Sequence, residues 1–199
     1  MLASVVTVTM LLLTRHGETD WNAERRWQGR SDPPLNERGR EQARELAATL
    51  DGIDVIYASD LARARETAEI LGDRLGLEVR LDARLRERSF GAWEGQTWED
   101  LEQRHAAALR RWQAGETHGP EDAEPYEDFS RRVESFLEEI LQTHPGERVL
   151  VVGHGGSIRA IHALAEGLDY GRDHLRIPSV ANCGLSRYSV LEGKLARLD

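Results

Sequence analysis

Two histidines, His16 and His154, stand in the same local context, each at the end of an apolar run and directly before a glycine. The runs are residues 11–15 and 149–153, and both are typical of a buried strand. A glycine directly after a strand lets backbone N–H groups come close to a ligand, and a helix that begins there favours an anion. The repeated pattern therefore predicts an anion-binding site with an imidazole at each of two strand ends.

Phosphoryl transfer is the chemistry that these residue types suit best. It needs a nucleophile aimed at phosphorus, cations on the equatorial oxygens and an acid for the leaving oxygen. Neutral His16 is a candidate nucleophile that would form a phosphohistidine, and His154, if protonated, adds a further donor. Arg15 and Arg63 are candidate phosphate ligands, because the planar guanidinium matches phosphate oxygens in a bidentate way. Arg65 competes with Arg63 but points elsewhere on the predicted helix.

Glu87 is the candidate acid. It lies in the charged segment Arg84–Gly91, with Phe90 and Trp93 nearby. An apolar wall raises the pKa of a carboxyl group, as a general acid requires, whereas neighbouring arginines lower it. The sequence leaves the balance of these two effects open.

The elements that must position these residues alternate between strands and helices. Helical periodicity begins after Asn36, a predicted N-cap, after Ser59, and again at Tyr126. We therefore predict one α/β domain over residues 1–199, with a mostly parallel central sheet covered on both sides and the last strand as a candidate antiparallel edge. Ligands bind such sheets at the carboxyl ends of the strands. Apolar runs predict strands at Val8–Leu13 (extending back to Thr7), Val55–Tyr57, Val149–Val152 and Leu185–Val190.

Composition narrows the functional classes. A chain of 199 residues with 40% hydrophobic and 31% charged residues is typical of a globular protein. The net charge of −9 excludes a broad surface for nucleic acid or anionic membrane. The single cysteine, Cys183, excludes an intramolecular disulfide and a multi-cysteine zinc site, and it fits a reducing compartment.

The first thirteen residues are apolar, but they lack a basic n-region and a small-residue cleavage site. They are also too short to span a bilayer. We therefore expect neither a signal peptide nor a membrane anchor, and a cytoplasmic location. Met10 is an alternative start, which an N-terminal mass measured on natively expressed protein would test.

The motifs together resemble the histidine phosphatase superfamily, also called the phosphoglycerate mutase-like family. They follow the family's order between positions 11 and 160, and as a set they are highly specific. The matching residues are Arg15-His16-Gly17-Glu18-Thr19, Trp21-Asn22, Gln28-Gly29, Pro34-Leu35, Ser59-Asp60-Leu61, Arg63-Ala64, Glu66-Thr67-Ala68, Glu87, Phe90-Gly91, Trp93-Glu94-Gly95 and Gly153-His154-Gly155-Gly156.

The resemblance implies a three-layer α/β/α fold and a reaction without metal or cofactor. It implies that His16 is phosphorylated, that Glu87 donates the proton, and that water then hydrolyses the phosphohistidine. The phosphate pocket would consist of Arg15, Arg63 and His154. Secondary phosphate contacts are expected from Asn22, Gln28, Gly29 and Gly155.

The resemblance favours the phosphatase branch over the mutases. Mutases of the family usually carry an insertion after the acid residue, whereas here the stretch between Gly95 and Tyr126 is short. Residues 27–32 also look more like the phosphatases. One departure concerns the Gly-Gly-Glu-Ser stretch of many phosphatases, where this chain has Asp122–Pro125 and keeps only Glu124. The substrate-facing loop is therefore unlike that of these relatives.

The expected function is hydrolysis of a small phosphomonoester. The alternatives are a cofactor-dependent phosphoglycerate mutase, a non-catalytic phosphate-binding regulatory member and, more remotely, a cysteine phosphatase built on Cys183. The leaving group stays open among sugar phosphates, phosphoglycerates, nucleotides and a ribazole-type phosphate. We expect its contacts to come from the loop Ala114–Pro125 and the tryptophans. The oligomeric state is also open, with a homodimer as the commonest assembly.

The cysteine, the tryptophans, the acidic stretch and the other histidines are interpreted mainly as packing or surface residues. Cys183 is expected to be a small buried hydrophobe. Trp98 and Trp112 are expected to pack on a helix, whereas Trp21 and Trp27 flank the phosphate motifs and are candidates for closing the pocket. The acidic stretch Glu121–Glu127 is predicted to be a solvated loop. The histidines without metal-ligand spacing, expected at the surface or in the core, are His105, His118, His144, His162 and His174.

Overall fold

The computed structural model describes residues 8–191 and 193–198, which form one six-stranded sheet in the order β3-β2-β4-β1-β5-β6. The first four of these strands in the sheet order run parallel, β5 is antiparallel to β1, and β6 is antiparallel to β5. The predicted mostly parallel α/β sheet is confirmed. The strands are β1 (Thr9–Arg15), β2 (Val55–Ala58), β3 (Val79–Leu81), β4 (Arg148–Gly153), β5 (Leu185–Leu191) and β6 (Lys194–Arg197).

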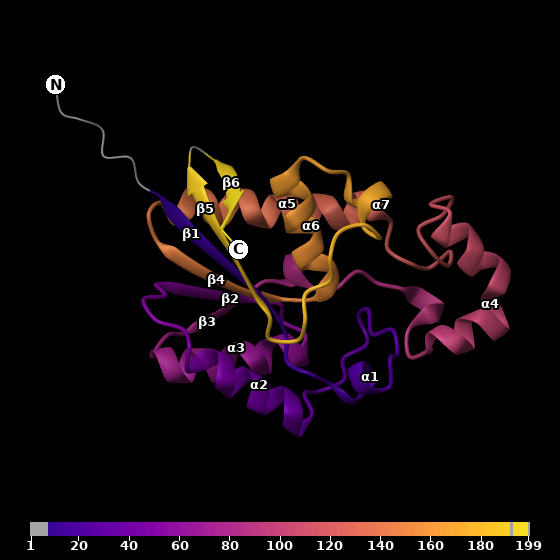
Figure 1. Cartoon of the computed structure of the whole chain (residues 1–199), viewed down its shortest axis with the longest axis horizontal. Coiled ribbons are helices and arrows are strands. Elements are labelled where there is room, and N and C mark those ends of the chain that lie inside the picture. Colours follow the sequence, from indigo (N-terminus) through magenta and orange to yellow (C-terminus); the bar gives the residue numbers. More distant parts are fainter. Residues whose placement is uncertain (1–7, 192, 199) are drawn as a thin grey trace.

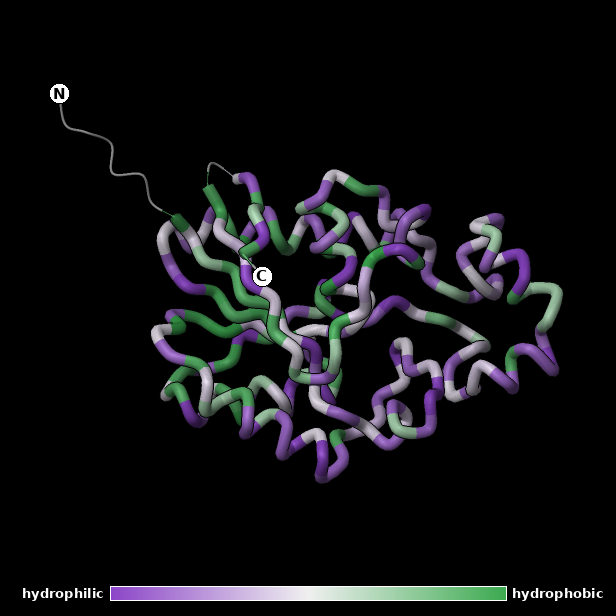
Figure 2. The backbone as a smooth tube through the Cα atoms, viewed as in Figure 1, coloured by the Kyte–Doolittle hydropathy of each residue, from purple (hydrophilic) through white to green (hydrophobic). Residues whose placement is uncertain are grey.

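Helices cover both faces of this sheet (Figure 1). Side chains alternate between the faces of a strand, so neighbouring leucines of β1 enter different cores. Leu12 packs in the core beneath α2 and α3, whereas Leu11 and Leu13 pack in the core beneath α5 and α6. Figure 2 shows the hydrophobic residues gathered on the central strands. The covering helices are α2 (Glu37–Ala47), α3 (Ala62–Leu75), α5 (Tyr126–Thr143) and α6 (Gly155–Glu166).

The helix α4 (Trp98–Gln113) projects from the sheet and kinks at His105. Its inner side forms a third apolar cluster, in which Trp112 packs with Trp93 and the partly buried Trp27. This cluster brings aromatic rings toward the carboxyl ends of the strands. The shorter elements are α1 (Asp20–Ala23), α7 (Tyr170–Asp173) and the 3-10 turns Ala83–Leu85 and Gly91–Trp93.

The strand predictions need three corrections. β1 continues to Arg15 because its last residues still pair with β4, and the predicted start at Thr7 lies outside the described residues. β5 is antiparallel as expected, but it is not the edge, because β6 pairs along it. The short β3 was not predicted, since a strand of three residues, two of them exposed, is too short to show a hydrophobic periodicity.

The helix predictions hold at the positions that matter for the site. The side chain of Asn36 caps α2 by accepting from the Gly39 N–H at 2.8 Å, and α5 begins at Tyr126. Residues 114–125 form the predicted loop. The acidic stretch after Glu121 is not fully solvated, because the side chain of Glu124 is only 11% exposed and pairs with arginines. None of the helices over residues 8–191 and 193–198 is long and apolar enough to cross a membrane.

Candidate active site

The two histidines meet because β1 and β4 are parallel neighbours in the sheet. Arg15 pairs with Gly153 in the last register position, so His16 and His154 follow side by side at the carboxyl edge. Their ring centroids lie 5.2 Å apart. β2 lies on the other side of β4 and ends just before Ser59. The two imidazoles therefore lie together at the carboxyl edge of the sheet, as predicted.

His16 is buried and oriented by its own backbone. Its Nδ1 lies 2.6 Å from the Gly17 carbonyl oxygen. A carbonyl can only accept, so Nδ1 carries the proton and Nε2 keeps its lone pair. Burial, reinforced by the nearby Arg63 and Arg15, holds the pKa of His16 well below its ordinary value. The ring is therefore a neutral imidazole with a free nucleophilic nitrogen.

The turn after His16 is held by close backbone packing. A Cβ on Gly17 would lie 2.4 Å from the Gly39 carbonyl oxygen, a distance that real side chains do not adopt. The Gly17 N–H donates to the Thr67 hydroxyl at 3.0 Å, and that hydroxyl donates to the Arg63 carbonyl at 2.7 Å. The nucleophile is thus linked to α3, the helix that carries Arg63.

His154 is fully buried, and its ring lies next to that of His16. Its Nε2 is 2.8 Å from the Ser59 hydroxyl, and its Nδ1 has no partner among the described residues. Burial, Arg63 and His16 hold the pKa of His154 well below its ordinary value. A charged His154 as an additional donor therefore requires an anion to enter first, since only a nearby negative charge offsets these effects.

Arg63 points inward from the first turn of α3. It is fully buried, and its Nη1 and Nη2 donate to the carbonyl oxygens of Ser31 and Gly29, both at 2.8 Å. Burial, with Arg15 nearby, lowers the pKa of Arg63 to about 10, so it remains a cation at neutral pH. Its Nε has no partner among the described residues. Arg65 instead faces outward toward Glu69, which supports the choice of Arg63.

Arg15 holds a second guanidinium at the same place. Its Nη1 donates to the Val180 carbonyl at 3.2 Å, and its Nε is buried without a partner in the described residues. Burial lowers the pKa of Arg15, while the Glu87 carboxylate opposes this. Two guanidinium groups, each with a buried and unused Nε–H, form a receptor for an oxyanion.

Glu87 is fixed by two backbone N–H groups. Its Oε2 accepts from Gly156 at 2.9 Å, and its Oε1 accepts from Arg88 at 2.8 Å. A Cβ on Gly156 would lie 2.1 Å from Glu87 Oε1, so only glycine leaves room for the carboxyl group. The contact places the carboxyl group at the start of α6, beside the histidines.

These groups border a cavity of about 340 Å³. Its lining includes six arginines, whereas Glu87 is the single carboxylate among the described residues that line it. The cavity is therefore cationic within a protein of net charge −9. The arginines are Arg15, Arg25, Arg26, Arg63, Arg88 and Arg159.

The sequence profile of the histidine phosphatase superfamily (branch 1) matches residues 11–198. The chain belongs to this superfamily. The match covers both histidine motifs and extends from within β1 to the end of β6. Phosphatases and proteins named as mutases are both found among its relatives.

A protein of Enterobacter sp. (strain 638) named "Probable phosphoglycerate mutase GpmB" is 39% identical over 192 residues, covering 90% of this chain and 84% of the relative. A mycobacterial glucosyl-3-phosphoglycerate phosphatase, solved with VO3, is 32% identical with a TM-score of 0.84, covering 95% and 96% of the two chains. A phosphoserine phosphatase mutant of Entamoeba histolytica, in complex with phosphoserine, is 28% identical with a TM-score of 0.83, covering 96% and 95%.

The structure brings most of the predicted site residues to one cavity. His154 differs, since its ring lies close to that of His16 but is not among the described residues that line the cavity. Asn22 lines the cavity but also caps α1, because its Oδ1 accepts from the Thr19 N–H at 3.1 Å. The carbonyl of Gly29 is turned toward Arg63. The predicted residues that line the cavity are Arg15, His16, Asn22, Gln28, Gly29, Arg63, Glu87 and Gly155.

Of the two expected sources of leaving-group contacts, only the tryptophans line the cavity. Trp21 and Trp27 line the cavity as predicted, and Trp112 lines it as well as packing in the core. The loop 114–125 does not line it, because its backbone instead accepts hydrogen bonds from Arg88 through His118 and Glu124.

Several lining residues were missed by sequence reasoning. Arg159 follows Gly155 by four positions on α6, a spacing that puts both on one helix face and could have revealed it. His174 was assigned to the surface or core, and it is buried, yet it borders the cavity and contacts the Tyr126 hydroxyl at 3.0 Å. No local pattern marks that long-range contact.

Cys183 is half-buried and is not among the described residues that line the cavity. Burial raises the pKa of its thiol to about 12, so the thiolate is scarce at neutral pH. Its backbone N–H donates to the Arg15 carbonyl at 2.9 Å, which ties this segment to the end of β1. The residue packs at the margin of the core beneath α2 and α3, close to its predicted role.

The two buried histidines predict a pH-dependent stability. Folding lowers the pKa values of both histidines, so below pH 6.5 the unfolded chain binds more protons than the folded chain. The free energy of unfolding therefore decreases as the pH is lowered. Each contributes about 1.4 kcal/mol per pH unit in that range. We expect urea unfolding between pH 7.5 and pH 5 to show this slope, and His16→Gln to reduce it. An unchanged slope in the variant would contradict the assignment, with His105→Gln as the control.

Proposed function

We propose that this chain is a metal-independent phosphatase that hydrolyses a small phosphomonoester through a phosphohistidine on His16. The observation that carries the proposal is the juxtaposition of a neutral, oriented imidazole with two guanidinium groups that each keep a buried, unused Nε–H. Such a receptor suits a phosphoryl dianion. The nucleophile needs no metal ion for its activation, because its pKa already leaves it neutral.

The first half of the reaction transfers the phosphoryl group to the enzyme. Arg15 and Arg63 hold the phosphoryl oxygens while the Nε2 lone pair of His16 attacks phosphorus. The P–N bond forms as the P–O bond to the alcohol breaks. The protonated Glu87 carboxyl group gives its proton to the leaving oxygen, so the alcohol leaves neutral.

The second half returns the enzyme to its starting state. A water molecule attacks the phosphohistidine and gives a proton to the Glu87 carboxylate. The P–N bond breaks, inorganic phosphate leaves, and His16 regains its lone pair. As the phosphoryl dianion sits against the imidazoles, its charge favours a protonated His154, which then serves as a further donor to a phosphate oxygen.

The lack of a covering segment over the cavity, within the part of the chain that the structure describes, favours hydrolysis over mutase activity. A mutase must shield its phosphohistidine from water until substrate is rephosphorylated. Here the stretch between Gly95 and Tyr126 is short, and the loop 114–125 contributes no lining residue. The relative GpmB is named as a mutase, whereas the two solved relatives are named as phosphatases. Mutase activity is therefore the second candidate.

The charge of the cavity favours a substrate with a second anionic group. One phosphoryl group would occupy Arg15 and Arg63, which leaves four lining arginines, among them Arg159 on α6. Its Nε is buried without a partner among the described residues. A carboxylate or second phosphate on the alcohol portion would match it. The names of the two solved relatives also refer to substrates that carry a carboxylate beside the phosphate.

The test is turnover of a panel of phosphomonoesters in excess chelator. The panel pairs esters with and without a carboxylate, such as phosphoserine with phosphoethanolamine and phosphoglycerate with glycerol phosphate. Released phosphate reports hydrolysis, and interconversion of the two phosphoglycerate isomers reports mutase activity. We expect phosphate release that chelation leaves intact, with the carboxylate member of each pair preferred.

Each outcome of the panel bears on the proposal. Isomer interconversion faster than phosphate release would establish the mutase alternative instead. Loss of turnover in chelator that added metal restores would overturn the metal-independent mechanism. Folded protein without turnover on any ester would favour a phosphate-binding regulatory protein.

A further inference from the structure

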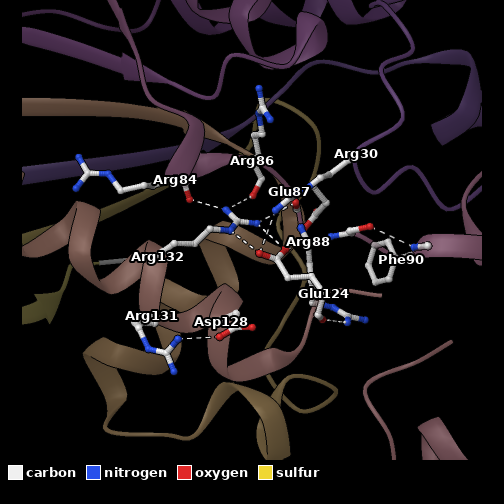
Figure 3. Close-up of polar contacts among 12 residues, drawn as sticks. Arg30, Arg84, Arg86, Glu87, Arg88, Phe90, Glu124, Asp128, Arg131 and Arg132 are labelled. Atoms are coloured by element: carbon white, nitrogen blue, oxygen red, sulfur yellow. Dashed lines mark hydrogen bonds and ion pairs between the residues drawn. The ribbon is translucent and has the colours of Figure 1, made fainter. Parts of the chain in front are cut away.

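Arg132 of α5 reaches from its helix to the segment that carries Glu87 (Figure 3). Its Nη1 donates to the carbonyl oxygens of Arg84 at 2.6 Å and Arg86 at 2.7 Å. Its Nη2 donates to the carbonyl oxygen of Glu87 itself at 3.0 Å. One guanidinium therefore holds the backbone of this segment at three points.

Glu124 fixes that guanidinium from the opposite side. Its two carboxylate oxygens accept from Arg132 Nε at 2.8 Å and Nη2 at 2.9 Å, and one also accepts from the Ser89 N–H at 3.2 Å. Arg30 adds a contact at 3.1 Å. Burial alone would raise the pKa of Glu124, but Arg132 and Arg30 hold it below its ordinary value. The pair is therefore ionised.

The residues of this pair are buried far more than an ordinary surface ion pair. The side chain of Arg132 is 16% exposed and that of Glu124 is 11% exposed. The adjacent Arg131 pairs with Asp128 at 2.7 Å, but those side chains are 71% and 57% exposed and Figure 3 shows them away from the Glu87 segment. Two neighbouring arginines of one helix thus make chemically similar pairs with different structural consequences.

We propose that the Arg132–Glu124 pair is a positioning device for the proton donor, in that it sets where the Glu87 carboxyl group meets the leaving oxygen. The proposal rests on the proposed role of Glu87 as the acid. The Glu87 side chain is held by the N–H groups of Gly156 and Arg88, and the backbone that supplies one of these is held by the pair. No substrate contact by Arg132 is required.

The leaving group distinguishes positioning from general structural support. Proton donation matters for an alkyl alcohol, which is a poor leaving group, and hardly matters for p-nitrophenol, which leaves as the anion. A displaced Glu87 therefore selectively slows the transfer of the phosphoryl group from an alkyl phosphate to His16, whereas the later hydrolysis of the phosphohistidine is common to both substrates. A protein that is merely destabilised loses active sites, and both substrates slow by the same factor.

The experiment compares kcat/KM, which reports the rate of phosphoryl transfer to His16 and excludes the shared hydrolysis of the phosphohistidine, for p-nitrophenyl phosphate and an alkyl phosphomonoester. The proteins compared are wild type, Glu87→Gln, Arg132→Lys, Glu124→Gln and Arg131→Ala. Arg132→Lys keeps the charge but cannot span the same carbonyl oxygens. We expect Arg132→Lys and Glu124→Gln to lower the alkyl rate about 100-fold. The aryl rate should change less than about threefold, and Arg131→Ala should leave both rates unchanged. Inhibition by inorganic phosphate checks that the phosphate pocket is intact.

The outcomes separate the two proposals. Equal loss on both substrates in the Arg132 and Glu124 variants, or no loss on either, would overturn the positioning role. If Glu87→Gln itself shows no selective loss on the alkyl ester, the assignment of Glu87 as the acid fails, and the inference fails with it. A selective loss in Glu87→Gln without one in Arg132→Lys and Glu124→Gln would refute the positioning role alone.

Discussion

Replacing His16 with alanine is expected to lower kcat by about 10⁵-fold, to the level of the background reaction. The nucleophilic nitrogen has no substitute, because His154 is fully buried and its Nε2 is engaged by Ser59. Guanidinium groups and a carboxyl group would remain in the pocket, so phosphate binding should persist. Phosphate release and inhibition by inorganic phosphate measure the two effects separately.

A direct observation of the intermediate completes this prediction. Wild type mixed with labelled substrate and quenched in base should retain label that acid releases, as expected for a P–N bond, and His16→Ala should retain none. His144→Ala serves as the control, because His144 is a buried histidine held by Tyr57 and Glu147 outside the cavity lining. Turnover by folded His16→Ala equal to that of wild type would refute the histidine mechanism.

Replacing Arg63 with lysine is expected to lower kcat/KM by about 10³-fold even though the charge is kept. The arginine donates to the Gly29 and Ser31 carbonyls and still has an unused Nε–H, whereas an ammonium group lacks the planar fork to serve both purposes. The replacement would also leave a buried carbonyl without its donor, which costs stability. Steady-state kinetics together with urea unfolding separate the loss of catalysis from the loss of stability.

Arg65→Lys is the matched control for the Arg63 prediction. The two arginines occupy the first turns of the same helix, but Arg65 is half exposed and lies 3.7 Å from Glu69. We expect Arg65→Lys to change kcat/KM less than about twofold. A loss as large as that of Arg63→Lys would show that the first turn of α3 tolerates no change. That outcome would contradict the phosphate-binding role assigned to Arg63.

The sequence by itself determined the elements and the residues that stand at their ends. Hydrophobic runs located β1, β2, β4 and β5 to within two residues at each end, since strand periodicity is a local property. Helical periodicity likewise separated the inward Arg63 from the outward Arg65. The cap at Asn36 and the glycines after both histidines are also local, because their effect depends on a few adjacent residues.

Only the tertiary structure decided how those residues act on one another. The proton on Nδ1 of His16 follows from a carbonyl distance, and the room for the Glu87 carboxyl group follows from the missing Cβ of Gly156. The Arg132–Glu124 pair joins segments that local patterns treat as separate. Such contacts depend on strand order and on packing between distant segments, which no short window of sequence contains. For the same reason, the sequence predicts Glu124 to lie in a solvated loop, whereas the structure shows its side chain buried against Arg132.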